Sequence, residues 1–360
     1  MSLGRALEGI ATPLDGLRQT AFGWALRSPL LPKILTRRDR RIAAIGTLHA
    51  IVALSLALLL PTLLFALGPV LFGVAHVAAD IRYLVLRREL ATWWRNVIWL
   101  GCAALIALHA AHEAKLLGFS LSIGEFSLTL VWAGLALVAG ARASGSWTRA
   151  LIAAPVIALA GWAVLANPEL GLMVVVHGHN LIAVAVWAIL FQRRLRGMLL
   201  PLAVIVGGSA ALVSGTLHGV IVDHAKLDAF GLGLFELSSW LSPGLPLPQS
   251  VGLTVAYVFL QSVHYAIWLI LIPQSDSGTE GTLTFRMSAR SLLRDFGGAP
   301  LIAIALSALI VIGGAFFDVH EARRLYLSLA MFHVYLEFVL LSYFWARSSP
   351  ARPLPARGLL

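Results

Sequence analysis

The stretch Phe72-Gly-Val-Ala-His76-Val-Ala-Ala-Asp80-Ile-Arg82-Tyr-Leu-Val-Leu-Arg-Arg88 places an imidazole and a carboxylate inside a long apolar run. Residues four apart lie on the same face of an α-helix, so His76 and Asp80 share a face. Ionisable side chains are expensive to keep in the hydrocarbon of a bilayer and usually mark a functional site there. The stretch therefore predicts a membrane-spanning helix that carries part of a site.

The composition of the whole chain agrees with a membrane protein. Its 360 residues are 59% hydrophobic and 12% charged, and the mean hydropathy is +0.86. These values predict an all-α, polytopic integral membrane helix bundle. The net charge of +10 comes from short basic clusters between apolar runs, a pattern that argues against nucleic-acid binding. The single cysteine, Cys102, excludes an intrachain disulfide and a site with several thiolate ligands.

About ten segments are long enough to cross a bilayer, which takes about 20 residues each. With both termini in the cytoplasm, the basic residues gather on the inner side, as the positive-inside rule requires. The exceptions are Lys115, Lys226, Arg323 and Arg324 on the outer side, and Arg82 within a span. This bias predicts a multi-pass protein of the cell inner (cytoplasmic) membrane. The predicted spans cover residues 43–66, 69–87, 96–117, 124–141, 148–166, 169–191, 198–220, 249–273, 299–317 and 322–345.

The transmembrane bundle, residues 42–346, has flanking segments of different character. Residues 1–41 are basic and amphipathic, with prolines at 13, 29 and 32 expected to break the segment, and residues 347–360 form a cytoplasmic tail. The outer loop 221–247 is rich in Leu, Phe, Gly and Pro, and is either a lid over a cavity or a plain connector. The inner loop 274–298 is polar and is expected to be solvated.

Histidines occur in seven of the predicted spans, but His49 and His218 lie near span ends and are interpreted as interfacial, which leaves five spans with candidate site histidines. His76 and Asp80 are four residues apart in the second, and His333 and Glu337 repeat this spacing in the last. With a helix start at residue 69, His76 lies about 10 Å below the outer surface, from a rise of ~1.5 Å per residue. The eighth span carries His264, followed by Trp268 one turn later.

The third span contains the densest polar group, His109-Ala-Ala-His112-Glu113. His109 shares a helix face with His112, three residues on, and with Glu113, four residues on. Such a group resembles the ligand pattern of carboxylate-bridged metal sites in helix bundles. Its place near the outer end is equally explained by a solvated helix terminus, and a proton relay is a further possibility.

The sixth span contains His177-Gly-His179, where the i, i+2 spacing points the two rings to nearly opposite faces. At most one of them is then expected to reach a shared centre. We assign that role to His177, because Gly178 beside it permits close helix approach.

One histidine in an apolar helix is explained by a hydrogen bond to a neighbouring helix. Convergence on one metal explains several of them together, since it offsets the free-energy cost of burying each. We therefore predict His76, His177, His264 and His333 as metal ligands, with Asp80 and Glu337 orienting the imidazoles from behind. Imidazole and carboxylate without thiolate suit non-haem Fe(II), with copper or zinc as alternatives.

Three motifs in these spans resemble the Brp/Blh family of bacterial membrane β-carotene dioxygenases. They are Ala75-His76-Val-Ala-Ala-Asp80, Phe259-Leu-Gln-Ser-Val-His264-Tyr-Ala-Ile-Trp268 and Phe332-His333-Val-Tyr-Leu-Glu337. At the second motif the family has another histidine one turn on, where this chain has Trp268. The resemblance implies an all-helical membrane enzyme that splits a carotenoid to retinal with O2 at a histidine-bound iron.

The residues and the resemblance together predict a metal-dependent oxygenase acting on a carotenoid or another long apolar substrate. His109, His112 and Glu113 are then additional catalytic residues, as ligands or in a proton relay. Three other classes use intramembrane histidines: a haem-binding redox protein, a zinc-dependent lipid hydrolase and a proton-coupled transporter. The absence of a visible internal repeat argues against the transporter.

Overall fold

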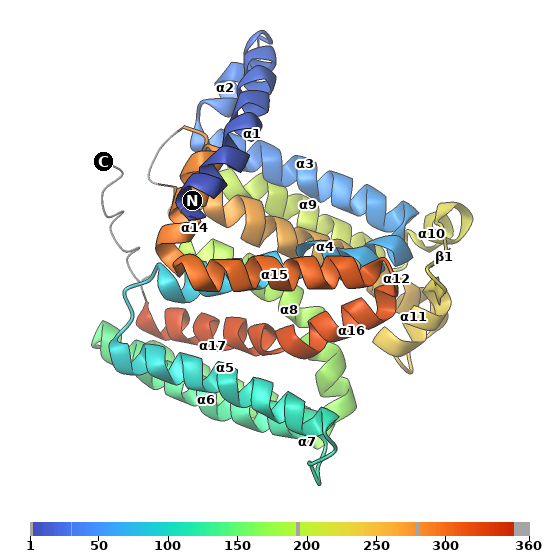
Figure 1. Ribbon diagram of the computed structural model, residues 1–360. Coiled ribbons are helices and arrows are strands. Elements are labelled where there is room, and N and C mark those ends of the chain that lie inside the picture. Colours follow the sequence, from blue (N-terminus) through green and yellow to red (C-terminus); the bar gives the residue numbers. More distant parts are fainter. Residues whose placement is uncertain (1–2, 30, 192–194, 278–280, 349–360) are drawn as a thin grey trace.

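The computed structural model describes residues 3–29, 31–191, 195–277 and 281–348, and nearly all of them are helical (Figure 1). The predicted cytoplasmic tail lies, from residue 349 onward, outside the described residues. The only strands in the described ranges are two short ones, β1 (Asp228–Ala229) and β2 (Leu232–Gly233), which pair antiparallel. The all-α fold class is therefore confirmed.

Within the described ranges, nine helical segments are long and apolar enough to cross a membrane. A bent pair, α9 (Leu195–Val213) and α10 (His218–His224), raises the number to ten if it counts as one span, with an angle of 81° between its parts. The nine are α3 (Arg38–Leu59), α4 with η1 (Pro61–Leu86), α5 (Thr92–Glu113), α6 (Leu121–Ser144), α7 (Thr148–Ala166), α8 (Pro168–Leu190), α12 with η3 and α13 (Leu247–Asp276), α15 (Gly298–Ala315) and α16 with α17 (Val319–Arg347).

Most predicted spans agree with these helices to within a few residues, and α4 departs most. It begins at Pro61 rather than near residue 69, because proline is well tolerated in the first turn of a helix. His76 therefore lies about 22 Å along its helix, at ~1.5 Å per residue, and not about 10 Å. This places His76 near the middle of the bundle.

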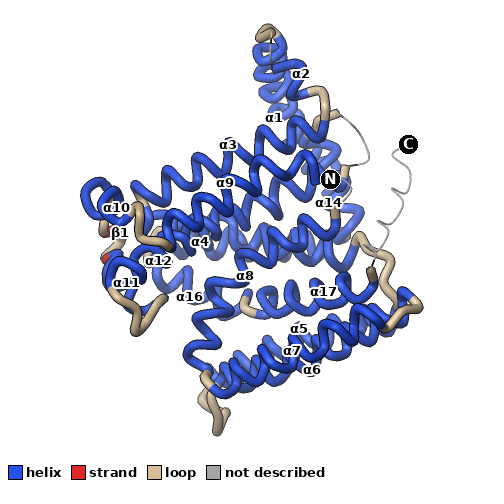
Figure 2. The backbone as a smooth tube through the Cα atoms, turned by 180° about the vertical axis from the view of Figure 1, so that it is seen from behind, coloured by secondary structure: helices blue, strands red, loops and turns tan. Residues whose placement is uncertain are grey.

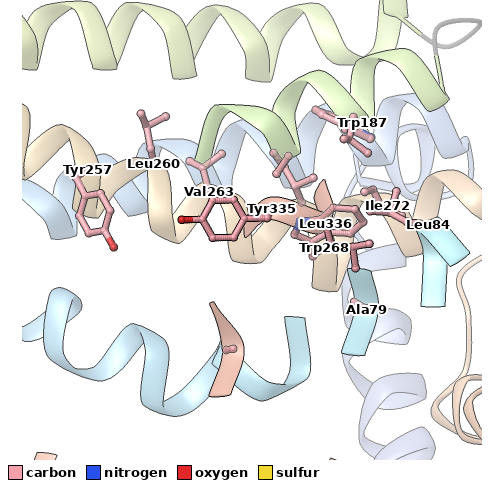
Figure 3. Close-up of a cluster of buried hydrophobic side chains, with 14 of the residues drawn as sticks. Ala79, Leu84, Trp187, Tyr257, Leu260, Val263, Trp268, Ile272, Tyr335 and Leu336 are labelled. Atoms are coloured by element: carbon pink, nitrogen blue, oxygen red, sulfur yellow. The ribbon is translucent and has the colours of Figure 1, made fainter. Parts of the chain in front are cut away.

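The centre of the bundle is α12, which packs against α3, α4, α8 and α9. In the most apolar 18 residues of this span, 83% of the residues are buried inside the protein. The corresponding share is 11% in α7 and 6% in α15, so these two helices face the lipid. Figure 3 shows Tyr257, Leu260 and Val263 along α12, in one buried cluster with Tyr335 and Leu336 of α17. This packing fixes α4, α8, α12 and α17 against one another at mid-depth.

The two ends of the bundle differ in character and lie opposite each other in both views (Figures 1 and 2). We call one the basic end: it carries α1 (Leu3–Leu26), α2 (Leu31–Leu35) and α14 (Phe285–Phe296). The other, the loop end, carries α10, the two strands and α11 (Leu234–Leu241). That the basic end faces the cytoplasm remains a prediction from the charge bias.

Two expectations for the basic end are wrong. Residues 274–298 are not simply a solvated loop, since they contain α14, whose amphipathic sequence gains stability by packing on α1. The predicted break at Pro13 is absent, because α1 continues through it. Asp15 of α1 joins the two helices by accepting hydrogen bonds from the backbone N–H groups of Phe285 (2.7 Å) and Arg286 (3.2 Å). Burial acts to raise the pKa of Asp15, but these hydrogen bonds outweigh it and hold the pKa below its ordinary value.

Candidate metal centre

Three of the helices that carry the predicted ligands are irregular near the histidines. After Asp80, α4 widens into the π-helical turn η1 (Ile81–Leu86), and after Ala266, α12 widens into η3 (Ile267–Leu271). The last span breaks at Met331, between α16 (Val319–Ala330) and α17 (Phe332–Arg347). π-Helical turns within α-helices occur frequently at functional sites. The irregularities therefore point to the same level of the bundle as the histidines.

His76, His264 and His333 come together at this level from α4, α12 and α17. One ring nitrogen from each lies within 4.8 Å of the others, and all three side chains are buried. The rings of His76 and His333 meet edge to face, with centroids 4.7 Å apart, and that of His264 is 5.1 Å from His76. Three of the four predicted ligands are thus close enough to bind one metal ion.

The tautomers of His76 and His333 favour a cation between them. In each ring Nδ1 lies at a backbone carbonyl, that of Phe72 (3.4 Å) for His76 and that of Ala330 for His333. Nδ1–H therefore donates in both rings, which leaves a lone pair on each Nε2. These two Nε2 atoms are 3.1 Å apart. Two lone pairs facing each other repel unless a proton or a metal ion lies between them.

The separation of the two Nε2 atoms also fits a metal ion. Nitrogens bound at ~2.0–2.1 Å lie about 2.8–3.0 Å apart at an octahedral angle and about 3.3–3.4 Å apart at a tetrahedral angle. The observed 3.1 Å falls between these values. Neither ring nitrogen of His264 has a hydrogen-bond partner of good geometry among the described residues, which leaves this imidazole available as the third ligand.

The assignment of His177 is wrong, and His179 takes its place beside the centre. Nε2 of His177 lies 2.9 Å from the carbonyl oxygen of Leu241, so this ring ties α8 to the end of α11. The His179 ring centroid lies 4.9 Å from that of His264 and 5.8 Å from that of His333. Nδ1 of His179 faces the carbonyl of Val176 at 3.3 Å, which again leaves Nε2 free. His179 is therefore a fourth imidazole of the cluster.

The two carboxylates lie one turn nearer the basic end, but they do not orient the histidine of their own helix. Glu337 Oε1 accepts a hydrogen bond from Trp268 Nε1 (2.8 Å) and lies 3.5 Å from His264 Nε2. Asp80 faces Glu337 rather than His76. Apart from this contact, both Asp80 oxygens and Glu337 Oε2 lack a partner among the described residues. Two buried carboxyl groups in contact repel each other if both are charged, so one of them must carry a proton or a metal cation must lie nearby.

His109, His112 and Glu113 stand apart from the histidine cluster, at the loop end. His112 and Glu113 are exposed. His109 Nδ1 lies 3.1 Å from Oε1 of Glu125, a buried carboxylate on α6 whose Oε2 accepts a hydrogen bond from the Tyr335 hydroxyl (2.9 Å). They are therefore not extra ligands of this cluster. Sequence reasoning missed Glu125, although a carboxylate inside an apolar run was the signal for it.

A hollow of about 940 Å³ with both polar and apolar side chains in its wall, which we call the vestibule, lies at the loop end. It is lined by parts of α4, α5, α6, α8, α11 and α16, including His109, Glu125 and Trp240. Trp240 belongs to the outer loop 221–247, so that loop covers one side of the vestibule, whereas Phe235 is not among its lining residues. Tyr265 and Tyr326, both buried, pack beside the cluster, with ring centroids 4.8 and 6.5 Å from that of His76.

A second hollow, the apolar cavity, reaches the cluster from the side. It measures about 360 Å³ and lies between α6, α7, α8 and α17. His179 lines it, and its other polar lining side chains are Thr129 and Tyr335. Val174, also in its wall, is 54% exposed, so the cavity opens between helices toward the lipid. An apolar molecule in the bilayer can therefore reach His179 without crossing a polar surface.

No family model, curated protein or solved structure matches the chain.

Proposed function

We propose that the chain is a metal-dependent oxygenase of the cell inner membrane, with non-haem iron held by His76, His264 and His333. Its substrate is a carotenoid or another long apolar molecule. The observation that carries this proposal is the convergence of three buried imidazole nitrogens within 4.8 Å, at mid-depth of a membrane bundle. The motif resemblance to the Brp/Blh family points to the same chemistry.

The ligand set supports iron over soft-ligand metals. Imidazoles with nearby carboxyl groups and no thiolate suit non-haem iron, whereas copper(I) prefers thiolate and thioether ligands. The one cysteine, Cys102, lies on α5 and is not part of the cluster. When bound, iron supplies the reaction with O2, which the amino-acid side chains cannot carry out.

The apolar cavity supports a long apolar substrate. Its volume of about 360 Å³ holds only a part of a long chain, and its opening toward the lipid leaves room for the remainder in the bilayer. The cavity wall aligns the chain beside His179 and so brings one bond of it close to the cluster. Exclusion of water by this wall protects the reacting part from side reactions.

The carboxyl groups serve the imidazoles rather than the substrate. Glu337, held in place by Trp268 Nε1, lies against His264 and stabilises positive charge on that side of the cluster. Asp80 adds a second carboxyl group next to Glu337. Both act from the basic end, so the loop end and the apolar cavity are left for O2 and substrate.

A haem site fits the cluster less well. Two axial nitrogens on opposite faces of a haem lie about 4 Å apart, with the porphyrin plane between them, if each bond is about 2.0 Å. The Nε2 atoms of His76 and His333 are 3.1 Å apart, and the His264 ring stands beside them. A porphyrin cannot pass between these rings without moving the helices.

The test is turnover by purified protein loaded with iron. Detergent-solubilised protein with Fe(II) and β-carotene should convert the polyene in air and not under argon, as measured by visible absorbance and product chromatography. His264→Ala should abolish conversion, while His177→Ala, at a histidine outside the cluster, should retain most of it. Conversion that needs no iron, or hydrolysis of a lipid ester with zinc in its place, would contradict the proposal.

A further inference from the structure

One arginine of the vestibule is held without a carboxylate partner. Arg323 of α16 lines this hollow, and its guanidinium carbon lies 3.9 Å from the ring centroid of Phe65. Its Nε is buried and has no hydrogen-bond partner, and no carboxylate of the described residues is within ion-pair distance. Its polar neighbours are the side chains of Tyr257, with which it forms a hydrogen bond, Tyr265 and Tyr326. The cation therefore has aromatic contacts but no counter-ion.

The next residue gives the contrast. Arg324 also lines the vestibule, but its NH2 lies 2.8 Å from Glu321 Oε2 and its NH1 lies 3.9 Å from Glu113 Oε2. Of these two adjacent arginines, Arg324 therefore has carboxylate partners and Arg323 has none among the described residues. A guanidinium that is partly desolvated and unpaired is unfavourable unless an anion joins it. The planar fork of arginine suits the two oxygens of a carboxylate or a phosphate.

The rest of the vestibule wall is both polar and apolar. It contains Phe65, which Arg323 contacts, and the apolar side chains of Leu327, Met331, Leu172 and Trp240. A small inorganic anion would contact only the arginine. An anionic group on an apolar chain would contact both the arginine and the apolar side chains of this wall. With a volume of about 940 Å³, the vestibule has room for such a chain.

We propose that the vestibule binds an amphiphile through its anionic head, with a carboxylate or phosphate seated on Arg323 and the apolar chain against Leu172, Trp240 and Leu327. This site is separate from the histidine cluster and does not depend on a metal. The same head-group chemistry occurs in a free fatty acid and in an anionic phospholipid. Glu236, an exposed acid in the same wall, opposes the bound anion.

The experiment measures ligand binding rather than turnover. Purified protein in a neutral detergent is titrated with oleate, with oleyl alcohol and with dioleoylphosphatidylglycerol, and binding is followed by calorimetry and by the shift in thermal unfolding temperature. Oleate should bind and oleyl alcohol should not. Binding by oleate alone identifies a free acid as the ligand, and binding by the phospholipid identifies a lipid head group. Failure of both anions to bind, or equal binding of the alcohol, overturns the proposal.

Variants locate the site. Arg323→Gln should weaken binding of the anion by roughly tenfold or more, since it removes a charge-assisted pair. Arg324→Gln, at the neighbouring paired arginine, should change it by less than about twofold. Glu236→Gln should strengthen binding of the anion. A variant that fails to fold can only lose affinity, so a gain cannot come from unfolding. If Arg323→Gln lowers the unfolding temperature without ligand and leaves the anion affinity unchanged, Arg323 is a packing partner of Phe65 and the proposal is wrong.

Discussion

The vestibule and the apolar cavity differ in size and in the polar groups of their walls. The vestibule at the loop end is large, and its wall contains histidines, acids and arginines. The apolar cavity is smaller, contains three polar side chains and leads to His179 from the lipid. The two proposals therefore use different walls: an apolar substrate in the apolar cavity, and an amphiphile with its anionic head on Arg323 in the vestibule. Substitutions on one side should therefore leave the other side's property unchanged.

The largest expected effect concerns the carboxylates at the basic side of the cluster, which belong to neither hollow. Glu337→Gln removes the charge beside His264 and should lower metal affinity by roughly ten- to a hundredfold. Competition with a chromophoric chelator measures this. Glu113→Gln, an exposed acid at the loop end, is the control and should leave the affinity unchanged. Equal affinity in Glu337→Gln and the native chain would mean that this carboxyl group does not act on the centre.

The apolar cavity is tested by filling it. A side chain at Gly178 meets no atom within 4 Å of its Cβ and projects beside the cavity wall, so Gly178→Leu should fold. The added bulk should lower turnover of a polyene by roughly tenfold or more, because a displaced chain loses its alignment. Metal content should not change. Gly207→Leu on α9, at another glycine with open space, is the matched control. If both variants lose turnover equally, the cavity is not the substrate site.

Glu125 connects the two hollows, because it lines the vestibule and bonds Tyr335 of the apolar cavity. Tyr335→Phe leaves one oxygen of this buried carboxylate unpaired and should lower the free energy of unfolding by roughly 1–3 kcal/mol. Reversible unfolding in mixed micelles measures this, with Glu113→Gln expected to stay within about 0.5 kcal/mol. An unchanged stability in Tyr335→Phe would show that water replaces the hydroxyl and that the two hollows communicate.

The smallest effect lies outside both hollows, in the contact between α1 and α14. The pKa of Asp15 is lowered in the folded state, so the stability from this contact is present above the unfolded-state value of 3.8 and is lost as pH falls through the folded pKa. We expect α1 to become accessible to protease at acid pH, while at neutral pH Asp15→Asn alone gives part of this effect. Metal content and turnover at neutral pH should be unaffected in Asp15→Asn. Loss of bound metal in this variant would show that the basic end and the cluster are coupled.

Much of the fold follows from the sequence, because about 20 apolar residues in succession have few alternatives to a spanning helix. The irregular parts do not follow. Helix α14 is short and amphipathic, and its stability depends on α1, which lies far away in the chain. The start of α4 at Pro61 was missed because the apolar run shows no break there.

The site was only partly predictable for a related reason. The spacing of His76 and Asp80 fixed their shared face, but it did not show that Asp80 faces Glu337 of another helix. For His177 and His179, the sequence showed two opposite faces of an apolar helix without showing which one meets α12 and α17. That choice depends on the packing of α8. The helix alone carries no signal for it.

The central claim is that His76, His264 and His333 hold one metal ion, and metal content tests it most directly. Native protein and the variants His76→Ala, His264→Ala, His333→Ala and His177→Ala are purified in parallel, and bound metal is measured per mole of folded protein. We expect about one iron in the native protein and in His177→Ala, and almost none in the other three. Equal metal content in all five proteins, or loss in His177→Ala alone, would contradict it.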